Sequence, residues 1–525
     1  MQLAIDIPHT HARVATNYAG AAVPVFSVIM SVVTVQLGQC GNQIGSQFFK
    51  TVYNDAAVSL KSGSKSSPSA YHDASMERFF TVAEPQVMKI SSSRASLEAK
   101  CVLVDMETKV VHQMLSEAKR SGNWSYDEKC VYTQKKGSGN NWASGYCRHG
   151  GRASEELMEM VQRQAERCDR LDGFLILMSV AGGTGSGVGA KITEVLCDTY
   201  PHSVITNQVV WPYSSGEVIV QDYNTILTTA HLQRASDVIL LMHNDQLHKV
   251  CSKLLLMRKI SFSDINQVVC HSLASLLQPS MKLEHLTQSI TSSDQSASHK
   301  CSVSDPLLYS QCSLSELQAH LCPRKDFKLI TLKSIPQIPD HSQAYSTFLW
   351  SGLLKHLQQM LITDSPIEDG MDWSKSLGEG CPPPPSILYG RDVGHCSSPS
   401  QRVSHVHHGI NKSLSNLLIL RGNELQTVDP SPFYDARLYS RSVPKSCTCS
   451  VWCSRYAFNN YEKSCTLVSN SQSCVSLLNS VCRKAWNMFS ARAYVYQYTE
   501  NGLSQEDFLE SFASVEQVLK NYASI

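Results

Sequence analysis

Apolar and polar positions follow two different rhythms along roughly the first half of the chain, and each rhythm predicts one kind of element. Short apolar runs at 31–37, 99–104, 173–180 and 237–242 predict buried strands. Stretches with helical spacing lie between them, for example the mixed-charge segment 155–170. Strands separated by helices are typical of βαβ units, so the pattern predicts an α/β fold built on a parallel sheet.

Several interruptions of this pattern predict loops or segments outside the fold. Segments 61–68 and 289–304 are rich in Ser, and 376–406 contains consecutive prolines and several glycines, so all three predict surface loops. The first 29 residues include an apolar run but lack the positive flank of a signal peptide. We therefore interpret Met30 as the natural start and residues 1–29 as an extension.

The last segment is predicted to be a helix packed against the body of the protein. Ser504 and Asp507 have the spacing of a capping box, in which two side chains satisfy backbone N–H groups reciprocally. Apolar residues then recur at helical intervals, namely Phe508, Phe512, Val515, Leu519 and Tyr522. Such a stripe on one side of a helix indicates core contact rather than a free partner-binding arm.

Composition excludes several classes of protein. Of the 525 residues, 42% are hydrophobic and 17% are charged, as is usual for a globular protein. The 46 Lys and Arg residues nearly balance the 45 Asp and Glu residues, so we expect no nucleic acid and no membrane among the partners. The 19 scattered cysteines favour reduced, buried thiols over a disulfide scaffold. One tight cluster, Cys447, Cys449 and Cys453, lacks the usual spacing and nearby His of a zinc site.

The main chemical signal is a glycine-rich run directly after the predicted strand at 173–180. Successive backbone N–H groups at the start of a helix bind phosphate, and glycine lets the backbone approach closely with positive φ. A helical stretch with Ile192 and Val195 follows. A phosphate-binding loop is therefore favoured over a flexible turn. The run consists of Gly182, Gly183, Thr184, Gly185, Ser186 and Gly187.

Two other nucleotide loops compete with this interpretation. The Walker A loop ends in Gly-Lys-Ser or Gly-Lys-Thr, which the chain lacks. The dinucleotide fingerprint fits formally, because Gly185, Gly187 and Ala190 have the spacing G-x-G-x-x-A. That motif belongs in the first βα unit of its domain and is weak when it stands alone. A Rossmann-type NAD-dependent oxidoreductase therefore stays open at this point.

Three more loops narrow the choice. Gly38-Gln-Cys-Gly-Asn-Gln43 follows the first strand, and Gly139-Asn-Asn-Trp142 is another Gly/Asn loop. Asp105-Met-Glu107 ends a strand and offers the hard oxygen ligands that Mg²⁺ uses. Together with 182–187, these motifs resemble the tubulin superfamily in identity, order and spacing. Further segments are most similar to the delta-tubulin subfamily, and they lie at 211–213, 216–221, 260–267, 467–472 and 484–489.

The resemblance covers nearly everything from Ser31 onward, and it implies a tubulin-like α/β architecture. A Rossmann-like GTP-binding domain with a parallel sheet would span 31–243. A core helix and a smaller α/β intermediate domain with inserted loops would span 244–474. C-terminal helices would fill 475–525, and residues 1–30 would lie outside the fold. The implied cofactors are GTP and Mg²⁺.

Residue by residue, the resemblance assigns a phosphate side to the site. Gly183, Thr184 and Gly185 would wrap the β- and γ-phosphates. Glu107 would hold Mg²⁺ through water, with Asp105 supporting it. Three residues of the first loop would line the phosphates and the base, namely Gln39, Cys40 and Gln43.

The sugar and base side is assigned in the same way. Asn140 would approach the sugar and phosphate. Asn244 and Asn266 would read the edge of guanine. Phe262 would stack on the base where the family often has Tyr, and stacking needs only an aromatic face.

Two positions depart from the family pattern. The ribose-binding Glu of the family is Gln221 here, and an amide bonds a sugar hydroxyl less strongly than a carboxylate does. Glu217 is a candidate substitute. Glu316 aligns with the acid that activates water on the nucleotide of the next subunit. The loop before it, 305–312, matches the family poorly, so a solvent-facing helical Glu is the equal alternative.

The resemblance implies a GTP-binding cytoskeletal protein of centrioles and basal bodies, which supports triplet microtubules and cilium or flagellum assembly. The expected location is the cytoplasm and cytoskeleton, with the nucleus as a further compartment. Partners would be other tubulins, epsilon-tubulin above all, and the microtubules of centrioles. GTP hydrolysis completed at a subunit interface is one hypothesis. A nucleotide-locked structural subunit without turnover is the other.

Overall fold

A computed structural model gives the fold of the chain. It describes residues 29–62, 70–83, 97–216, 218–284, 309, 312–343, 345–375, 377 and 409–525. Glu217 and almost all of the predicted extension and inserted loops lie outside these ranges. In the described part, no helix is both long and apolar enough to cross a membrane.

A continuous sheet of 11 strands organises the molecule, in the order β5-β4-β1-β6-β7-β8-β10-β13-β11-β12-β9. The strands from β5 to β10 in this order are all parallel, which confirms the predicted α/β class. β13 joins β10 and β11 in antiparallel pairing and so makes the second half of the sheet mixed. The 11 strands of the whole sheet are β1 (Ser31–Leu37), β4 (Cys101–Asp105), β5 (Val131–Thr133), β6 (Leu171–Ser179), β7 (Val204–Trp211), β8 (Val238–His243), β9 (Met281–Lys282), β10 (Leu329–Ile335), β11 (Ser413–Gly422), β12 (Cys449–Ser454) and β13 (Lys463–Ser471). A separate pair is β2 (Phe80–Val82) with β3 (Leu97–Ala99).

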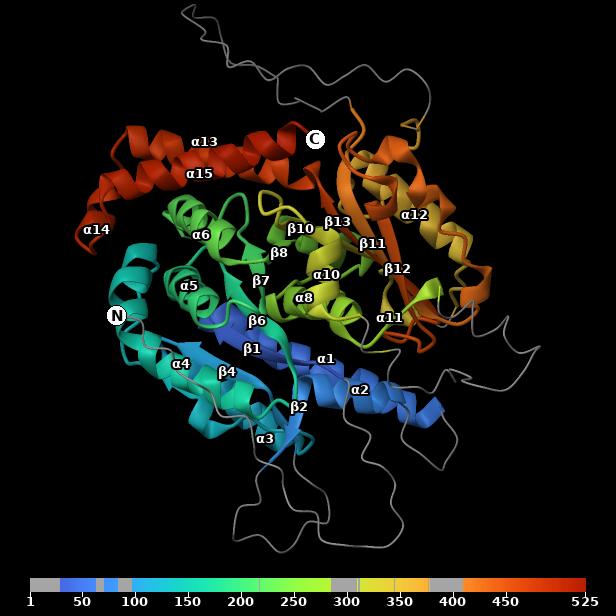
Figure 1. The fold of residues 1–525 in the computed structure, drawn as a ribbon, viewed down its shortest axis with the longest axis horizontal. Coiled ribbons are helices and arrows are strands. Elements are labelled where there is room, and N and C mark those ends of the chain that lie inside the picture. Colours follow the sequence, from blue (N-terminus) through green and yellow to red (C-terminus); the bar gives the residue numbers. More distant parts are fainter. Residues whose placement is uncertain are drawn as a thin grey trace, which may run out of the picture.

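Helices cover both faces of the sheet (Figure 1). They are α1 (Gly38–Ser62), α2 (Ala70–Phe79), α3 (Thr108–Ser121), α4 (Gly151–Glu166), α5 (Gly189–Thr199), α6 (Gln221–Ala235), α7 (Asn244–Lys249), α8 (Phe262–Leu277), α10 (Leu314–Leu321), α11 (Asp340–Gln343), α12 (Trp350–Thr363), α13 (Val475–Ser490), α14 (Val495–Thr499) and α15 (Gln505–Ala523). Side chains of β1 point to the two faces of the sheet and pack against different helices. Val33 and Val35 pack with α4, α5 and α6, whereas Val32 packs with α1, α3 and α8.

The predicted strands and helices are largely confirmed. Residues 31–37 form β1 throughout, and 173–180 and 237–242 correspond to β6 and β8 within two residues. These runs were readable because a parallel strand covered on both faces is apolar along its whole length. The run 99–104 divides between β3 and β4, because a bend at Lys100 separates them.

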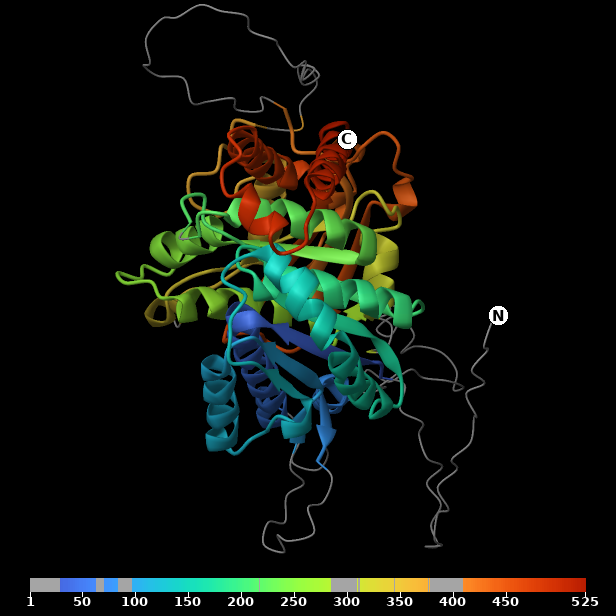
Figure 2. The same cartoon turned by 90° about the vertical axis from the view of Figure 1, so that its left-hand side faces the viewer.

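The C-terminal helices pack on the outside of α6. Ser504 and Asp507 form the predicted capping box of α15. Trp486 of α13 stacks on Phe512 of α15 with ring centroids 4.2 Å apart. Figure 2 shows the two helices together at one end of the molecule, with the first strands and helices at the other. The stripe on α15 is therefore core, as predicted, with Phe508, Phe512 and Tyr522 fully buried.

Candidate nucleotide site at the carboxyl edge of the sheet

Five parallel strands end at one edge of the sheet, which we call the carboxyl edge. β1 leads into Gly38, β4 ends at Asp105, and β6 leads into the run 182–187. β7 leads into the segment 212–216, and β8 leads into Asn244. In an open parallel sheet covered by helices, ligands bind outside the carboxyl ends of the strands. The fold therefore brings the predicted loops together at the carboxyl edge.

Two of the glycine loops are in direct contact. Gly38 has φ +69°, and a Cβ there would lie 3.1 Å from the backbone N of Gly185. A Cβ on Gly183 would lie 2.7 Å from the carbonyl O of Asn141 and 2.9 Å from Ser138 Oγ. Glycine is thus required for the loops at 38, 138–141 and 182–187 to close on one another.

The backbone around the run is arranged as an anion site. A wide helical turn, Thr184–Val188, continues directly into α5. Ser138 Oγ and Thr184 Oγ1 share a hydrogen bond of 2.7 Å, and Ser186 Oγ donates to the carbonyl of Gly182. The N–H groups of the first helical turn lack internal partners, and the helix dipole favours negative charge there. This geometry fits phosphate.

A residue that sequence reasoning did not select, Asn224 of α6, joins the loops. Its Nδ2 donates to the carbonyls of Asn140 and Ala181 at 2.8 and 2.7 Å. Its Oδ1 accepts from the backbone N of Trp142 at 3.0 Å and from the phenolic OH of Tyr498 at 2.6 Å. All four polar capacities of this fully buried amide are used, so both loops depend on one side chain. Polar residues around it in α6 are also buried, so the sequence of this helix has no helical periodicity that would single out Asn224.

The acidic loop fits a hydrated Mg²⁺. Asp105 is buried at the end of β4, and burial raises the pKa of its carboxyl to about 6. A nearby cation would relieve that cost. Glu107 is exposed, and a Cβ on Gly137 would lie 2.6 Å from Glu107 Oε1, so this carboxylate reaches the loop before Ser138. Carboxylate oxygens beside a phosphate cradle are suitable Mg²⁺ ligands through water.

The predicted base-binding residues lie at the starts of α7 and α8. α8 runs parallel to α1, because Cys270 Sγ contacts the carbonyl of Ile44 and Gln278 Nε2 donates to that of Val52. Both helices therefore begin at the carboxyl edge. Three predicted contacts follow this geometry: Asn244 is the first residue of α7, Phe262 is the first of α8, and Asn266 lies one turn later. Phe262 is 55% exposed, so its ring is accessible for stacking.

The remaining predicted residues of the first loop lie at the start of α1. Gln39 is exposed, whereas Cys40 and Gln43 are half-buried. Burial raises the pKa of the Cys40 thiol to about 12, so this group is neutral. Asn42, between them, donates to the carbonyls of Gly38 and Val104 and so ties this loop to β4.

Gln221, the predicted ribose-binding residue, is the first residue of α6, and its amide already makes a hydrogen bond. Gln221 Nε2 donates to the carbonyl of Tyr213 at 2.9 Å. This leaves Oε1 as the acceptor for a sugar hydroxyl. Glu217, the alternative, lies outside the described residues.

Comparison of the sequence with known proteins indicates which class of nucleotide these loops bind. Residues 31–252 match the GTPase domain of the Tubulin/FtsZ family. The chain is 44% identical to the tubulin delta chains of Macaca fascicularis and Mus musculus over 497 residues, 94% of this chain and 100% of each relative. Identity to the human tubulin delta chain is also 44%, over 499 residues. The chain belongs to the tubulin family.

Membership favours GTP over NAD for the glycine run. This tubulin is a GTP-binding protein similar to delta chains, which confirms the predicted family. The G-x-G-x-x-A spacing at 185–190 is thus a coincidence of a tubulin phosphate loop. It follows β6, in the middle of the parallel strands, rather than the first βα unit that a dinucleotide site uses. The individual residue contacts with GTP stay predictions.

Glu316 of this tubulin lies far from the nucleotide loops. Asp172, at the beginning of β6, accepts hydrogen bonds from the backbone N of Leu314 at 2.6 Å and from Ser315 Oγ at 3.1 Å. α10 therefore sits where the parallel strands begin, which we call the amino edge. β6 separates Asp172 from Ser179, and seven strand residues span roughly 23 Å. Within one subunit, Glu316 does not reach the glycine run.

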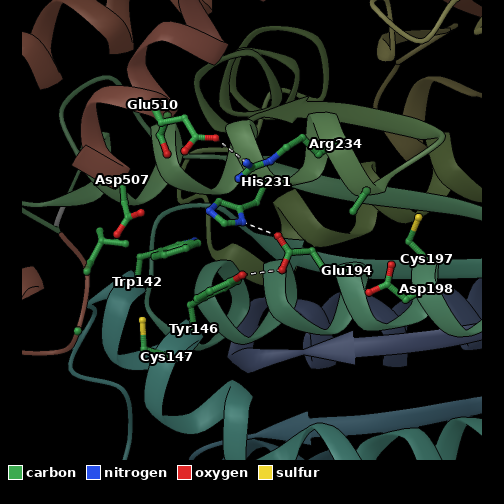
Figure 3. A pocket seen from close by; sticks show the side chains of 14 residues that line it. Trp142, Tyr146, Cys147, Glu194, Cys197, Asp198, His231, Arg234, Asp507 and Glu510 are labelled. Carbon is green, nitrogen blue, oxygen red and sulfur yellow. Dashed lines mark hydrogen bonds and ion pairs between the residues drawn. The ribbon is translucent and has the colours of Figure 1, made fainter. Parts of the chain in front are cut away.

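A polar cavity of about 600 Å³ lies behind the Gly/Asn loop, between α5, α6 and α15 (Figure 3). Tyr146 and His231 both point at Glu194, with distances of 2.6 and 2.5 Å. Burial alone would raise the pKa of Glu194, but hydrogen bonds from His231 and Tyr146 hold this pKa below its ordinary value. Trp142 stacks on Tyr146 and forms one wall. No residue of the run 182–187 lines this cavity, so it is distinct from the nucleotide site.

Proposed function

We propose that this tubulin binds GTP·Mg²⁺ at its carboxyl edge and associates head to tail with other tubulins. The observation that carries this proposal is the placement of the two predicted sites at opposite ends of β6. Glycine loops lie at one end, and the exposed acid Glu316 lies at the other. A head-to-tail contact is heterologous, so it brings one subunit's amino edge onto the next subunit's carboxyl edge.

In such a contact, Glu316 would face a nucleotide that it cannot reach within its own subunit. A carboxylate beside the terminal phosphate can orient the attacking water, which is the main chemical task left to the protein in phosphoryl transfer. GTP hydrolysis would then require two subunits. A nucleotide-locked structural subunit without turnover is the second candidate, because Glu316 also fits an exposed helical position.

The cellular role we propose follows the similarity to delta chains. The protein would act in the triplet microtubules of centrioles and basal bodies and in cilium or flagellum assembly. Its partners would be epsilon-tubulin and centriolar microtubules. A tagged full-length chain expressed in ciliated cells should gather at centrioles and basal bodies. An even cytoplasmic distribution in cells with intact basal bodies would contradict this role.

The ligand is tested most directly by identifying the nucleotide that copurifies with the protein after denaturation. We expect GTP or GDP. In competition binding, GTP should displace a labelled guanine nucleotide and NAD should not. Displacement by NAD but not by GTP would overturn the proposal.

Turnover is tested by measuring GTP hydrolysis in the presence of epsilon-tubulin with the wild-type chain and with Glu316→Ala. A loss of hydrolysis with unchanged GTP binding would support the interfacial mechanism. Unchanged hydrolysis would remove Glu316 from it. An absence of hydrolysis in the wild-type complex would favour the nucleotide-locked subunit.

A further inference from the structure

Glu316 has a cationic neighbour at the amino edge. Lys282 Nζ lies 3.3 Å from Glu316 Oε2. The side chains are 33% and 48% exposed, so both remain accessible to a molecule that approaches this edge. An ion pair that solvent reaches contributes little to stability, because water screens the attraction. Stability alone gives little reason for this pairing.

The helix that carries Glu316 is firmly anchored. Asp172 accepts from the backbone N of Leu314, and Ser313 Oγ accepts from that of Glu316 at 3.2 Å. At the other end of α10, the carbonyl of Leu321 accepts from Asn470 Nδ2 at 2.7 Å. Because these anchors are buried, the backbone of α10 keeps a fixed position on the sheet.

Lys282 is held on an independent frame. It belongs to β9, whose two residues pair with β12 in the register Met281–Cys453 and Lys282–Trp452. Trp452 and Cys453 are buried, so the strand that holds the lysine is part of the packed sheet. Two separately fixed elements therefore direct opposite charges toward the same exposed point.

This arrangement matters for an anion that approaches Glu316. A carboxylate repels a phosphate group, because both carry negative charge and the repulsion is strong at close range near a protein surface. An ammonium group 3.3 Å from the carboxylate offsets that repulsion. Lysine also binds phosphate as a point charge, so it can exchange its carboxylate partner for a phosphate oxygen.

We propose that Lys282 contacts the terminal phosphate of the nucleotide held by the next subunit and thereby lets Glu316 approach it. The inference rests on the head-to-tail contact proposed above and adds a second residue, of opposite charge, to it. In the free subunit Lys282 pairs with Glu316. In the assembled pair the ammonium bridges the carboxylate and the terminal phosphate of the neighbour.

The test measures association of the full-length chain with epsilon-tubulin loaded with either GDP or the non-hydrolysable triphosphate analogue GMPPCP. Lys282→Met should weaken binding to the triphosphate-loaded partner about tenfold, because a charge-assisted hydrogen bond to phosphate is lost. Binding to the diphosphate-loaded partner should change less than about threefold. Lys282→Arg should restore most of the triphosphate preference. Arg234→Met is the matched control, since Arg234 forms an exposed ion pair with Glu510 elsewhere.

Glu316→Gln provides the opposing change. It removes the repulsion, so triphosphate-dependent binding should stay the same or tighten, and it should offset part of the Lys282→Met defect. If the wild-type chain does not bind the partner, or binds equally with both nucleotides, the proposed function fails and this inference fails with it. If the wild type prefers the triphosphate and Lys282→Met keeps that preference, the inference alone is wrong.

Discussion

The two ends of strand β6 carry sites that are built in opposite ways. At the carboxyl edge, glycine loops are held by the fully buried side chain of Asn224. At the amino edge, Glu316 is exposed and Lys282 is half-buried, whereas the anchors of their elements, such as Asp172, are buried. A site that holds its own ligand needs loops that are fixed by its own chain. A site that acts on a neighbour's ligand has to remain at the surface.

The comparison is tested most severely by Asn224→Ala. This change leaves the carbonyls of Asn140 and Ala181, the N–H of Trp142 and the phenol of Tyr498 without their partner. We expect the free energy of unfolding to fall by about 3–5 kcal/mol and GTP binding to be lost. Urea denaturation and nucleotide titration would show both effects. Tyr498→Phe removes one of the four bonds and should cost about 1 kcal/mol; an equal loss in the two variants would contradict the central role of Asn224.

Gly183→Ala addresses the loops without removing a hydrogen bond. The added Cβ would lie 2.7 Å from the carbonyl O of Asn141, so the loops must separate. We expect GTP affinity to fall at least tenfold, or about 1.4 kcal/mol or more. Gly151→Ala is the matched control, because a Cβ there meets nothing within 4 Å and lies in α4. That variant should bind GTP normally and gain up to about 1 kcal/mol of stability; equal affinities would contradict the contact.

Asp172→Asn probes the amino edge alone. The amide keeps one acceptor oxygen but loses the charge that caps the first turn of α10. We expect a loss of about 1–2 kcal/mol of unfolding free energy and unchanged GTP affinity. GTP hydrolysis in the presence of epsilon-tubulin should slow, because Glu316 is less firmly placed. A loss of GTP affinity as large as that of Gly183→Ala would show that the two edges are not independent.

Asp105 makes the stability of the carboxyl edge depend on pH. The pKa of its carboxyl is about 6 in the folded protein, above the ordinary 3.8, so the folded state binds this proton more tightly than the unfolded state does. The free energy of unfolding therefore falls as pH rises from about 4 to 6. Asp105→Asn removes that term. Without nucleotide and Mg²⁺, the free energy of unfolding of the variant should exceed that of the wild type by roughly 3 kcal/mol at pH 7 and match it near pH 4. Thermal unfolding across this range would measure the difference; added GTP·Mg²⁺ should reverse the order at pH 7.

Much of the carboxyl edge could be predicted from the sequence, because its chemistry depends on the backbone. Strand β6 is apolar throughout, and glycines are conspicuous directly after it. Asn224 was missed because 12 of the 15 residues of α6 are buried. A helix buried all round has no polar face against which a functional amide would stand out.

The amino edge was harder for a different physical reason. Lys282 and Glu316 are 34 positions apart, on a two-residue strand and a short helix, and only the fold brings them together. The capping of α10 by Asp172 is also long-range, since Asp172 and Leu314 are 142 positions apart in the chain. Local patterns carry no record of such contacts.

The short helix α14 connects the C-terminal segment to the loops of the nucleotide site. Asn141 Nδ2 donates to the carbonyl of Gln497, Arg148 Nη2 donates to that of Glu500, and Tyr498 bonds Asn224. Detaching the last thirty or so residues would therefore uncover unpaired polar groups beside the phosphate cradle. We therefore expect opening of this segment to be coupled to release of the nucleotide, so that ligand binding protects the end of the chain from local unfolding.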